Sequence, residues 1–173
     1  IYHWILLYKQ TKFKITVNIM NVTRVFDILE HKSLNHPNHP VFSAKEEGKW
    51  VKHYLNEYIE KANYVSYGLL KLGLKKNDKV ALISSSRPEW NYLDMGVQQI
   101  GAVMVPIYPT ISEDDYRYIL NHAEAQYIFI EGPELLRKMK NILQDLNTVK
   151  AIYTFKKRDE NTSSFDELLE LGK

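Results

Sequence analysis

The sequence predicts an α/β fold with a doubly wound, mainly parallel sheet and helices on both faces. Short apolar runs bounded by turn residues recur four times, at residues 79–84, 103–108, 127–130 and 151–155, with helical segments between them. Such runs are typical of buried parallel strands. Their alternation with helices indicates right-handed crossovers that cover both faces of the sheet. The 173 residues, 45% hydrophobic and 25% charged, have the composition and length of one globular domain.

The first nineteen residues differ from the rest. Residues 1–8 (IYHWILLY) are apolar but too short to span a bilayer, and lysines follow them instead of preceding them, the wrong order for a secretory signal. Met20 is the first methionine. We therefore expect residues 1–19 to be a translated leader or an artificial segment, with an extra edge strand over 15–19 as the alternative. The domain itself is expected to occupy residues 20–173.

A short helix and a β-hairpin are expected ahead of the sheet. Apolar residues at helical spacing predict the helix over residues 21–32. His36 and His39 follow in a loop with two prolines, where a metal site is disfavoured because no carboxylate or thiol stands nearby. Residues 41–54 then predict two short strands joined by a turn at 46–49.

Start and stop signals set the bounds of the remaining helices. Asn56 is a good N-cap for a long amphipathic helix, and Gly73 is the expected terminator because glycine enters the left-handed conformation without strain. A second helix is expected over residues 88–99, with proline in its first turn. Ser112 predicts the cap of a third helix, and a fourth is expected over residues 135–146.

The last part of the sequence ends without a closing strand. Residues 156–164 are polar and are expected to form a loop, and residues 165–169 are helical in character. We therefore expect this α/β unit to be a truncated part of a larger domain, incomplete at its C-terminus.

Composition and motif searches exclude several kinds of site. The formal net charge is +2 with interspersed signs, which gives no reason to expect a nucleic-acid partner, and there is no cysteine for disulfides, thiolate metal sites or cysteine nucleophiles. The seven glycines form no GxGxxG or Walker motif, and no GxSxG elbow occurs. A triad of Ser84, His122 and Asp94 can be imagined, but helical placement explains the histidine and the aspartate equally well.

One polar segment stands out, at residues 84–90 (SSSRPEW), directly after the first central strand. Ligands of open α/β sheets bind beyond the carboxyl ends of strands. Arg87, Glu89 and Trp90 are therefore candidates for lining a cleft. A structural interpretation stays open, in which Ser86 caps the next helix, Glu89 complements the helix dipole and Trp90 fills the core.

Four strings together resemble the long-chain branch of the AMP-forming fatty acyl-CoA synthetases, in the adenylate-forming, AMP-binding superfamily. They are residues 70–83 (LKLGLKKNDKVALI), 87–90 (RPEW), 99–110 (QIGAVMVPIYPT) and 118–122 (YILNH). The similarity runs from about Met20 to the end of the chain. It implies a ligase that converts a fatty acid and ATP into acyl-adenylate and pyrophosphate, with Mg²⁺. Coenzyme A then displaces AMP to give acyl-CoA.

The parts that perform this chemistry in the family lie further along its sequence. They are a Ser/Thr/Gly-rich loop ending in lysine, an aromatic-Thr-Glu motif, a ribose-binding aspartate and a C-terminal lysine. None of these motifs is present here. We therefore expect no catalytic, cofactor-binding or metal-binding residue in this chain, no bound cofactor, and no activity of the fragment alone.

Partners and location follow from the same resemblance. The fatty acid would bind through the missing part of the enzyme, and the surface exposed by truncation is expected to favour self-association. No segment is long enough to span a membrane, and a cytoplasmic protein, with peripheral membrane attachment as the alternative, is expected. The competing functional hypothesis is a stand-alone α/β module that binds a nucleotide, an acyl group or a protein without catalysis.

Overall fold

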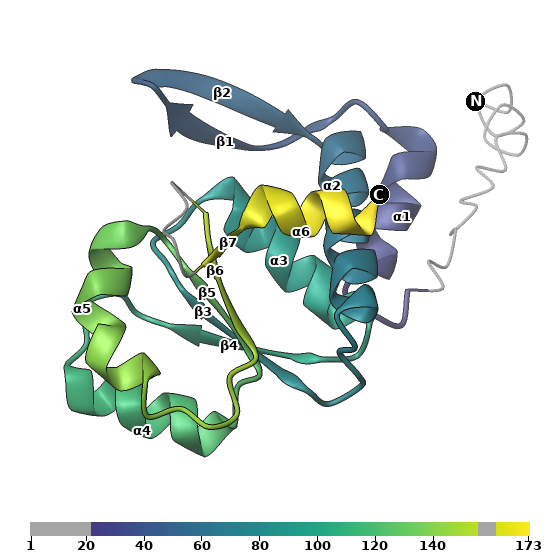
Figure 1. The fold of residues 1–173 in the computed structure, drawn as a ribbon. Coiled ribbons are helices and arrows are strands. Elements are labelled where there is room, and N and C mark those ends of the chain that lie inside the picture. The colour runs from purple at the N-terminus through teal and green to yellow at the C-terminus, as the bar shows by residue number, and fades with distance from the viewer. Residues whose placement is uncertain (1–21, 156–161) are drawn as a thin grey trace, which may run out of the picture.

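The computed structural model describes residues 22–155 and 162–173. The expected leader at residues 1–19 and the alternative strand at 15–19 lie outside the described residues. Within the described part, a five-stranded parallel sheet forms the centre, with a separate two-stranded hairpin beside it (Figure 1). The predicted doubly wound α/β class is confirmed.

The central sheet has the strand order β4-β3-β5-β6-β7, and every neighbouring pair is parallel. The strands are β3 (Lys79–Ile83), β4 (Val103–Ile107), β5 (Tyr127–Ile130), β6 (Ala151–Thr154) and β7 (Ser163–Ser164). Four of them were predicted. The interpretation of residues 156–164 as a loop is wrong at its end, because β7 pairs with Tyr153 and Thr154 of β6. Two residues are too few to show an apolar pattern, so this pairing leaves no local signal.

Alternate side chains of the buried strands enter two separate cores. On β3, Val80 and Leu82 join the core under α2, α3 and α6, whereas Ala81 and Ile83 join the core under α4 and α5. This period of two is the geometry of a strand buried on both faces. The helices that cover the sheet are α2 (Leu55–Lys71), α3 (Pro88–Gln99), α4 (Glu113–Ala123), α5 (Pro133–Leu143) and α6 (Phe165–Gly172).

The N-terminal part consists of α1 (Asp27–Asn35) and a hairpin of β1 (Pro40–Glu46) and β2 (Lys49–Tyr54). The predicted helix and β-hairpin are thus both present. The helix begins later than expected. The Asp27 carboxylate accepts hydrogen bonds from the backbone N–H groups of Thr23 and Arg24, which holds the residues before the helix in a turn. In Figure 1 the hairpin extends from the top of α2 above the sheet.

Tertiary contacts replace one of the predicted caps. Helix α2 begins at Leu55, and Asn56 lies inside its first turn instead of at the N-cap. The N–H groups of Leu55 and Asn56 donate to the carbonyls of His39 and Pro37, so the preceding loop satisfies these groups. At the other end, Gly73 adopts φ +86° and terminates the helix as predicted. Helix α4 also has its predicted cap, since Ser112 accepts from the Asp115 N–H.

Helix α5 differs from its prediction at both ends. It begins at Pro133 and ends at Leu143, where the sequence indicated residues 135–146. Proline is well suited to the first helical position because its missing N–H has no partner there anyway. The last helix, α6, is fixed by a capping box between Ser164 and Glu167.

Helix α2 approaches both of its neighbours through glycine. A Cβ atom added to Gly96 of α3 would lie 2.5 Å from Cγ1 of Val65, and one added to Gly68 of α2 would lie 2.8 Å from Cδ1 of Leu168 in α6. Beside the Gly96 contact, the buried Ser66 hydroxyl bonds to the carbonyl of Ala62 and to the side chain of Gln99. The two helices are therefore joined by close backbone packing and by a buried polar contact.

We predict that Gly96→Ala destabilises the chain by about 1–3 kcal/mol, because the new methyl group overpacks the contact with Val65. Urea denaturation followed by circular dichroism measures the change. The exposed position Glu60 of α2 provides the control, and Glu60→Ala should change stability by less than about 0.5 kcal/mol. Equal stability of Gly96→Ala and the parent chain would contradict the packing described.

Candidate functional site

The sheet topology marks one place where a ligand crevice is expected. From β3 the chain crosses to β4 on one side and returns to β5 on the other side of β3. Loops that leave neighbouring strands toward opposite faces open a crevice at their carboxyl ends, and ligands of doubly wound folds bind there. The segments that begin at Ser84 after β3 and at Glu131 after β5 meet at this point.

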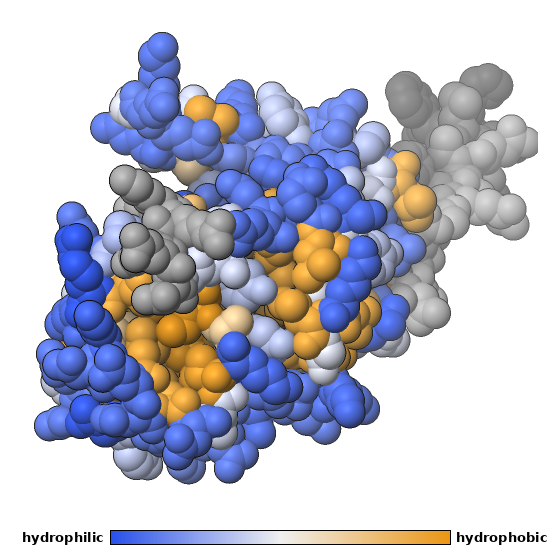
Figure 2. Space-filling model, viewed as in Figure 1, coloured by the Kyte–Doolittle hydropathy of each residue, from blue (hydrophilic) through white to orange (hydrophobic). Residues whose placement is uncertain are grey.

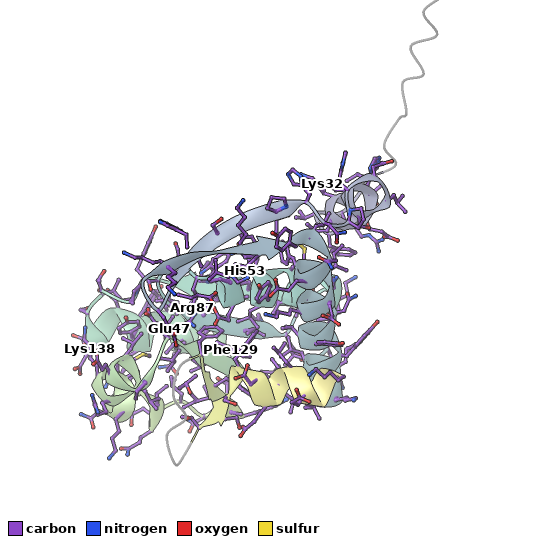
Figure 3. All side chains as sticks on the ribbon, turned by 90° about the horizontal axis from the view of Figure 1, so that it is seen from above. Lys32, Glu47, His53, Arg87, Phe129 and Lys138 are labelled. Atoms are coloured by element: carbon purple, nitrogen blue, oxygen red, sulfur yellow. The ribbon has the colours of Figure 1, made fainter. Side chains whose placement is uncertain are left out.

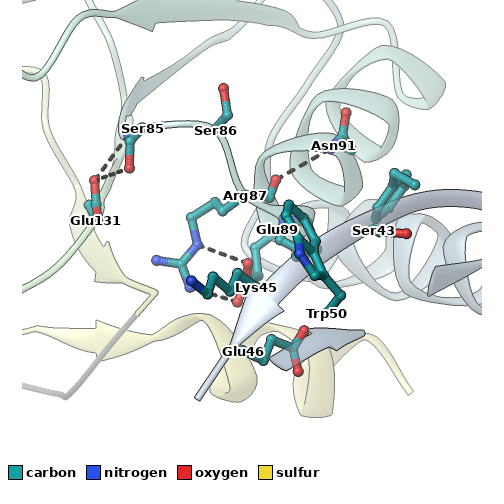
Figure 4. Close-up of a pocket in the computed structure, with 13 residues that line it drawn as sticks. Ser43, Lys45, Glu46, Trp50, Ser85, Ser86, Arg87, Glu89, Asn91 and Glu131 are labelled. Carbon is teal, nitrogen blue, oxygen red and sulfur yellow. Dashed lines mark hydrogen bonds and ion pairs between the residues drawn. The ribbon is translucent and has the colours of Figure 1, made fainter. Parts of the chain in front are cut away.

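A hollow of about 590 Å³ lies between this edge of the sheet and the hairpin (Figure 4). Arg87 and Glu89, two of the three candidates from the sequence, line it. Its other lining residues are Phe42, Ser43, Ala44, Lys45, Glu46 and Trp50 from the hairpin, and Ser85, Ser86, Pro88, Asn91 and Glu131 from the sheet side. The indole of Trp50 is 74% exposed. The wall thus combines charged and hydroxyl side chains with apolar surface, including one exposed aromatic ring.

The Glu131 carboxylate sits at the switch point itself. Its Oε2 atom accepts hydrogen bonds from the Ser85 N–H at 3.0 Å and from the Ser85 hydroxyl at 2.7 Å. These are the kinds of donors that would hold a phosphate in a nucleotide-binding fold. Because a carboxylate already accepts from them, the crevice presents negative charge where a phosphate would bind.

Arg87 and Glu89 form a bidentate pair inside the hollow. The Arg87 Nε and Nη2 atoms donate to the two Glu89 carboxylate oxygens at 2.8 and 2.7 Å, and the guanidinium lies 4.9 Å from the centre of the Phe155 ring. Burial is the largest single influence and raises the pKa of the Glu89 carboxyl, but the hydrogen bonds and charge of Arg87, the Glu89 N–H and the charge of Lys61 together lower the pKa below its ordinary value. The pair is therefore charged at neutral pH and locked in one geometry.

Trp90, the third candidate, faces a different space. It lines a neighbouring hollow of about 580 Å³ with residues 84–86 and 106–110. Its side chain also packs against the core under α3, in agreement with the structural interpretation. That interpretation is wrong for Ser86, because Arg87 occupies the N-cap of α3 and no side chain caps the helix. Ser85 and Ser86 line both hollows and connect them.

The first hollow does not fit the ATP and Mg²⁺ that the resemblance implies. Arg87 is already paired with Glu89, and the Ser85 donors already bind Glu131. In addition, residues 22–155 and 162–173 contain no group of three or more His, Asp or Glu side chains that could hold a metal ion.

Within the same two ranges, no helix is long and apolar enough to cross a bilayer.

The imagined triad is not assembled. Asp94 accepts a hydrogen bond from Gln98 on its own helix, and His122 stacks on Tyr118 of α4 with ring centroids 5.6 Å apart. The Ser84 hydroxyl donates to the carbonyl of Ser85. Each of these side chains thus has a local structural partner.

Two features of the hollow were missed at the level of sequence. Glu131 directly follows the predicted strand at residues 127–130, so the switch-point rule applied to the second strand as well as the first would have found it. Lys45 and Trp50 carry no such signal, because the position of the hairpin depends on its contacts with α2 and α3.

We predict that Arg87→Met raises the pKa of Glu89, because the burial effect remains when the hydrogen bonds and the charge of Arg87 are lost. In the parent chain the lowered pKa stabilises the fold above about pH 4.3, the ordinary glutamate value, and this contribution is lost as pH falls through the folded-state pKa. Carbon-detected NMR titration of the carboxyl groups measures both values. Arg117→Met, on the exposed side of α4, is the control and should leave Glu89 unchanged.

The chain is similar to proteins that are named as CoA ligases. A long-chain-fatty-acid–CoA ligase of Homo sapiens (ACSBG2) is 30% identical over 139 residues, which are 78% of this chain and 21% of that protein. FadD15 of Mycobacterium bovis, also named as a long-chain-fatty-acid–CoA ligase, is 32% identical over 104 residues, 60% of this chain and 17% of its own length. The chain therefore spans about a fifth of the length of the curated relatives it matches.

Solved structures and family models agree on the fold. The crystal structure of the anthranilate CoA ligase AuaEII in complex with anthranoyl-AMP superposes with a TM-score of 0.77 at 23% identity, over 86% of this chain and 28% of that one. The model of the family described as "AMP-binding enzyme" matches residues 29–170. Because this match takes in most of the sequence, the chain belongs to the AMP-binding enzyme family.

Proposed function

We propose that the chain is the N-terminal α/β subdomain, residues 20–173, of a ligase that activates fatty acids. The whole enzyme would convert a fatty acid and ATP into acyl-adenylate and pyrophosphate, and would then pass the acyl group to coenzyme A with release of AMP. The observation that carries this proposal is the family match over residues 29–170 together with relatives named as long-chain-fatty-acid–CoA ligases.

The chemistry of adenylation explains why this chain is proposed to be inactive alone. Attack of a carboxylate on the α-phosphorus of ATP needs donors and cations that neutralise charge on the phosphates. In the hollow at the switch point, the donors of Ser85 and Arg87 already form hydrogen bonds, to the carboxylates of Glu131 and Glu89 respectively. We therefore assign no catalytic, cofactor-binding or metal-binding role to these residues. Arg87, Glu89 and Trp90 are proposed to shape the wall of a cleft that the rest of the enzyme completes.

We predict that fatty-acid-dependent exchange between ATP and pyrophosphate occurs with the longest polypeptide that the gene encodes, and not with this chain. Exchange of labelled pyrophosphate into ATP measures the first half-reaction alone. Palmitate is the test substrate, and a reaction without fatty acid is the control. Exchange catalysed by this chain would contradict the proposed division of labour. Exchange by neither form, with the longer one folded, would favour a stand-alone binding module.

The open side of β6 supports the proposal that more protein packs here. β7 pairs only with Tyr153 and Thr154, so Ala151 and Ile152 have no strand beyond them among the described residues. Figure 2 shows apolar surface gathered on this face, on both sides of the β6 ribbon of Figure 1. An apolar surface beside an unpaired strand edge favours association with another chain.

We predict that this chain self-associates in a concentration-dependent way through that edge, as measured by sedimentation equilibrium. Ala151→Lys should raise the dimer dissociation constant several-fold, because lysine on an edge strand opposes pairing with a second edge. Tyr118→Lys, at an exposed aromatic residue of α4, is the matched control and should have no effect. A monodisperse monomer at all concentrations would contradict the proposal.

A further inference from the structure

The hairpin has one face of exposed side chains. Cross-strand partners in an antiparallel pair share a face, and Ser43 pairs with Lys52 and Lys45 with Trp50. Because side chains along a strand alternate between faces, Tyr54 lies on the same side as Lys52 and Trp50. All five residues are exposed. We call this set of five residues the outer face.

The opposite, inner face attaches the hairpin to the helices. His53 of β2 is only 6% exposed, stacks on Phe42 of β1, and has its Nδ1 atom 2.9 Å from the hydroxyl of Tyr92 in α3. Figure 3 shows His53 where the hairpin passes over the helices. The outer face is therefore on the side of the hairpin that these contacts leave open.

Aromatic rings stand on the outer face, where polar side chains are expected. An antiparallel pair with one face on a core usually has a polar opposite face. Here Trp50 is 74% exposed and Tyr54 is 41% exposed. Trp50 borders the first hollow, but this position leaves most of its indole open to solvent. Both residues combine an apolar ring with a polar group, which suits a boundary between water and an apolar phase.

The outer face carries charge of one sign only. It holds Lys45 and Lys52, and no ion pair joins either ammonium group to another of the described residues. Glu46 lies on the inner face, with its Oε1 atom 3.0 Å from Nε2 of His53, and Glu47 lies in the turn. Figure 4 shows the Lys45 and Glu46 side chains leaving the strand in different directions. The register thus keeps the carboxylates away from the lysines and the rings.

This combination of side chains indicates the kind of partner. Interfaces between proteins are enriched in Trp and Tyr but depleted of Lys, so a protein partner accounts for only half of the outer face. At the surface of an anionic bilayer, ammonium groups are attracted to the lipid headgroups, and Trp and Tyr rings lie at headgroup level. The hairpin also stands out above the sheet, so a planar surface can reach it (Figure 1).

We propose that the outer face of the hairpin docks on the surface of a membrane that contains anionic lipids. The lysines contribute attraction to the headgroups, and Trp50 and Tyr54 enter the boundary between headgroups and acyl chains. The hairpin lies on the membrane surface and does not span it. This inference rests on the hairpin alone and does not depend on the proposed ligase function.

Co-sedimentation of the whole chain with lipid vesicles tests the charge of the partner. The chain should sediment with vesicles of phosphatidylcholine mixed with phosphatidylserine, and much less with phosphatidylcholine alone. Added salt should weaken the binding, because it screens charges at a surface. No binding to the mixed vesicles, or equal binding to both kinds, would overturn the proposal.

Lysine variants test which surface binds. Lys45→Gln and Lys52→Gln should each lower the partition coefficient for the mixed vesicles about fivefold, as expected for the loss of one positive charge near an anionic membrane. Lys140→Gln, at an exposed position of the basic helix α5, is the matched control and should have no effect. Unchanged binding of the Lys45→Gln, Lys52→Gln double variant, or an equal loss in Lys140→Gln, would overturn the proposal.

An aromatic variant separates a bilayer from a soluble polyanion such as a nucleic acid. Trp50→Ser should lower vesicle binding several-fold, whereas Tyr118→Ser, at an exposed ring of α4, should leave it unchanged. In the parent chain, vesicles with brominated acyl chains should quench tryptophan fluorescence, and Trp50→Phe should remove most of this quenching. Circular dichroism checks that each variant is folded. Unchanged binding by folded Trp50→Ser would show attraction by charge alone and would overturn docking on a bilayer.

Discussion

The structure depends on how closely helix α2 can approach its two neighbours. Gly96 lets α3 lie against Val65, and Gly68 lets the backbone of α6 lie against α2. Dispersion forces fall off steeply with distance, so contacts at this range fix the helices in one arrangement. The core on this side of the sheet, from Leu69 through Phe129 to Leu168, is closed by these three helices.

The same arrangement positions the candidate site. Helix α3 begins at Pro88, directly after the carboxyl end of β3, so its packing against α2 sets the position of Arg87 and Glu89. The hairpin, which forms the other wall of the hollow, is joined to α3 by the contact between His53 and Tyr92. One wall therefore belongs to the rigid sheet, and the other is attached through a small set of polar and aromatic contacts.

The elements whose bounds were predicted correctly are those whose ends are set by residues close to them in the sequence. Residues 88–99 and 127–130 agree with α3 and β5 at both ends, because proline and turn residues bound them sharply. Asn56 misled because the backbone carbonyls of His39 and Pro37, in the loop before the hairpin, satisfy the start of α2. Strand β7 gave no signal because only two of its residues pair with β6. For the site, the polar segment after β3 was identified, but the separation of Trp90 from Arg87 depends on packing that no spacing rule contains.

The contact between α2 and α6 has a consequence for synthesis of the chain. The Lys71 ammonium donates to the carbonyl of Leu171, across a separation of 100 residues. At roughly 5–20 residues per second, translation takes on the order of 5–20 s to add this length. Throughout that time α2 has been synthesised while the helix that covers it has not been made. Contacts of such long range also slow folding, so the face of α2 that α6 covers stays exposed to solvent for longer before it is buried.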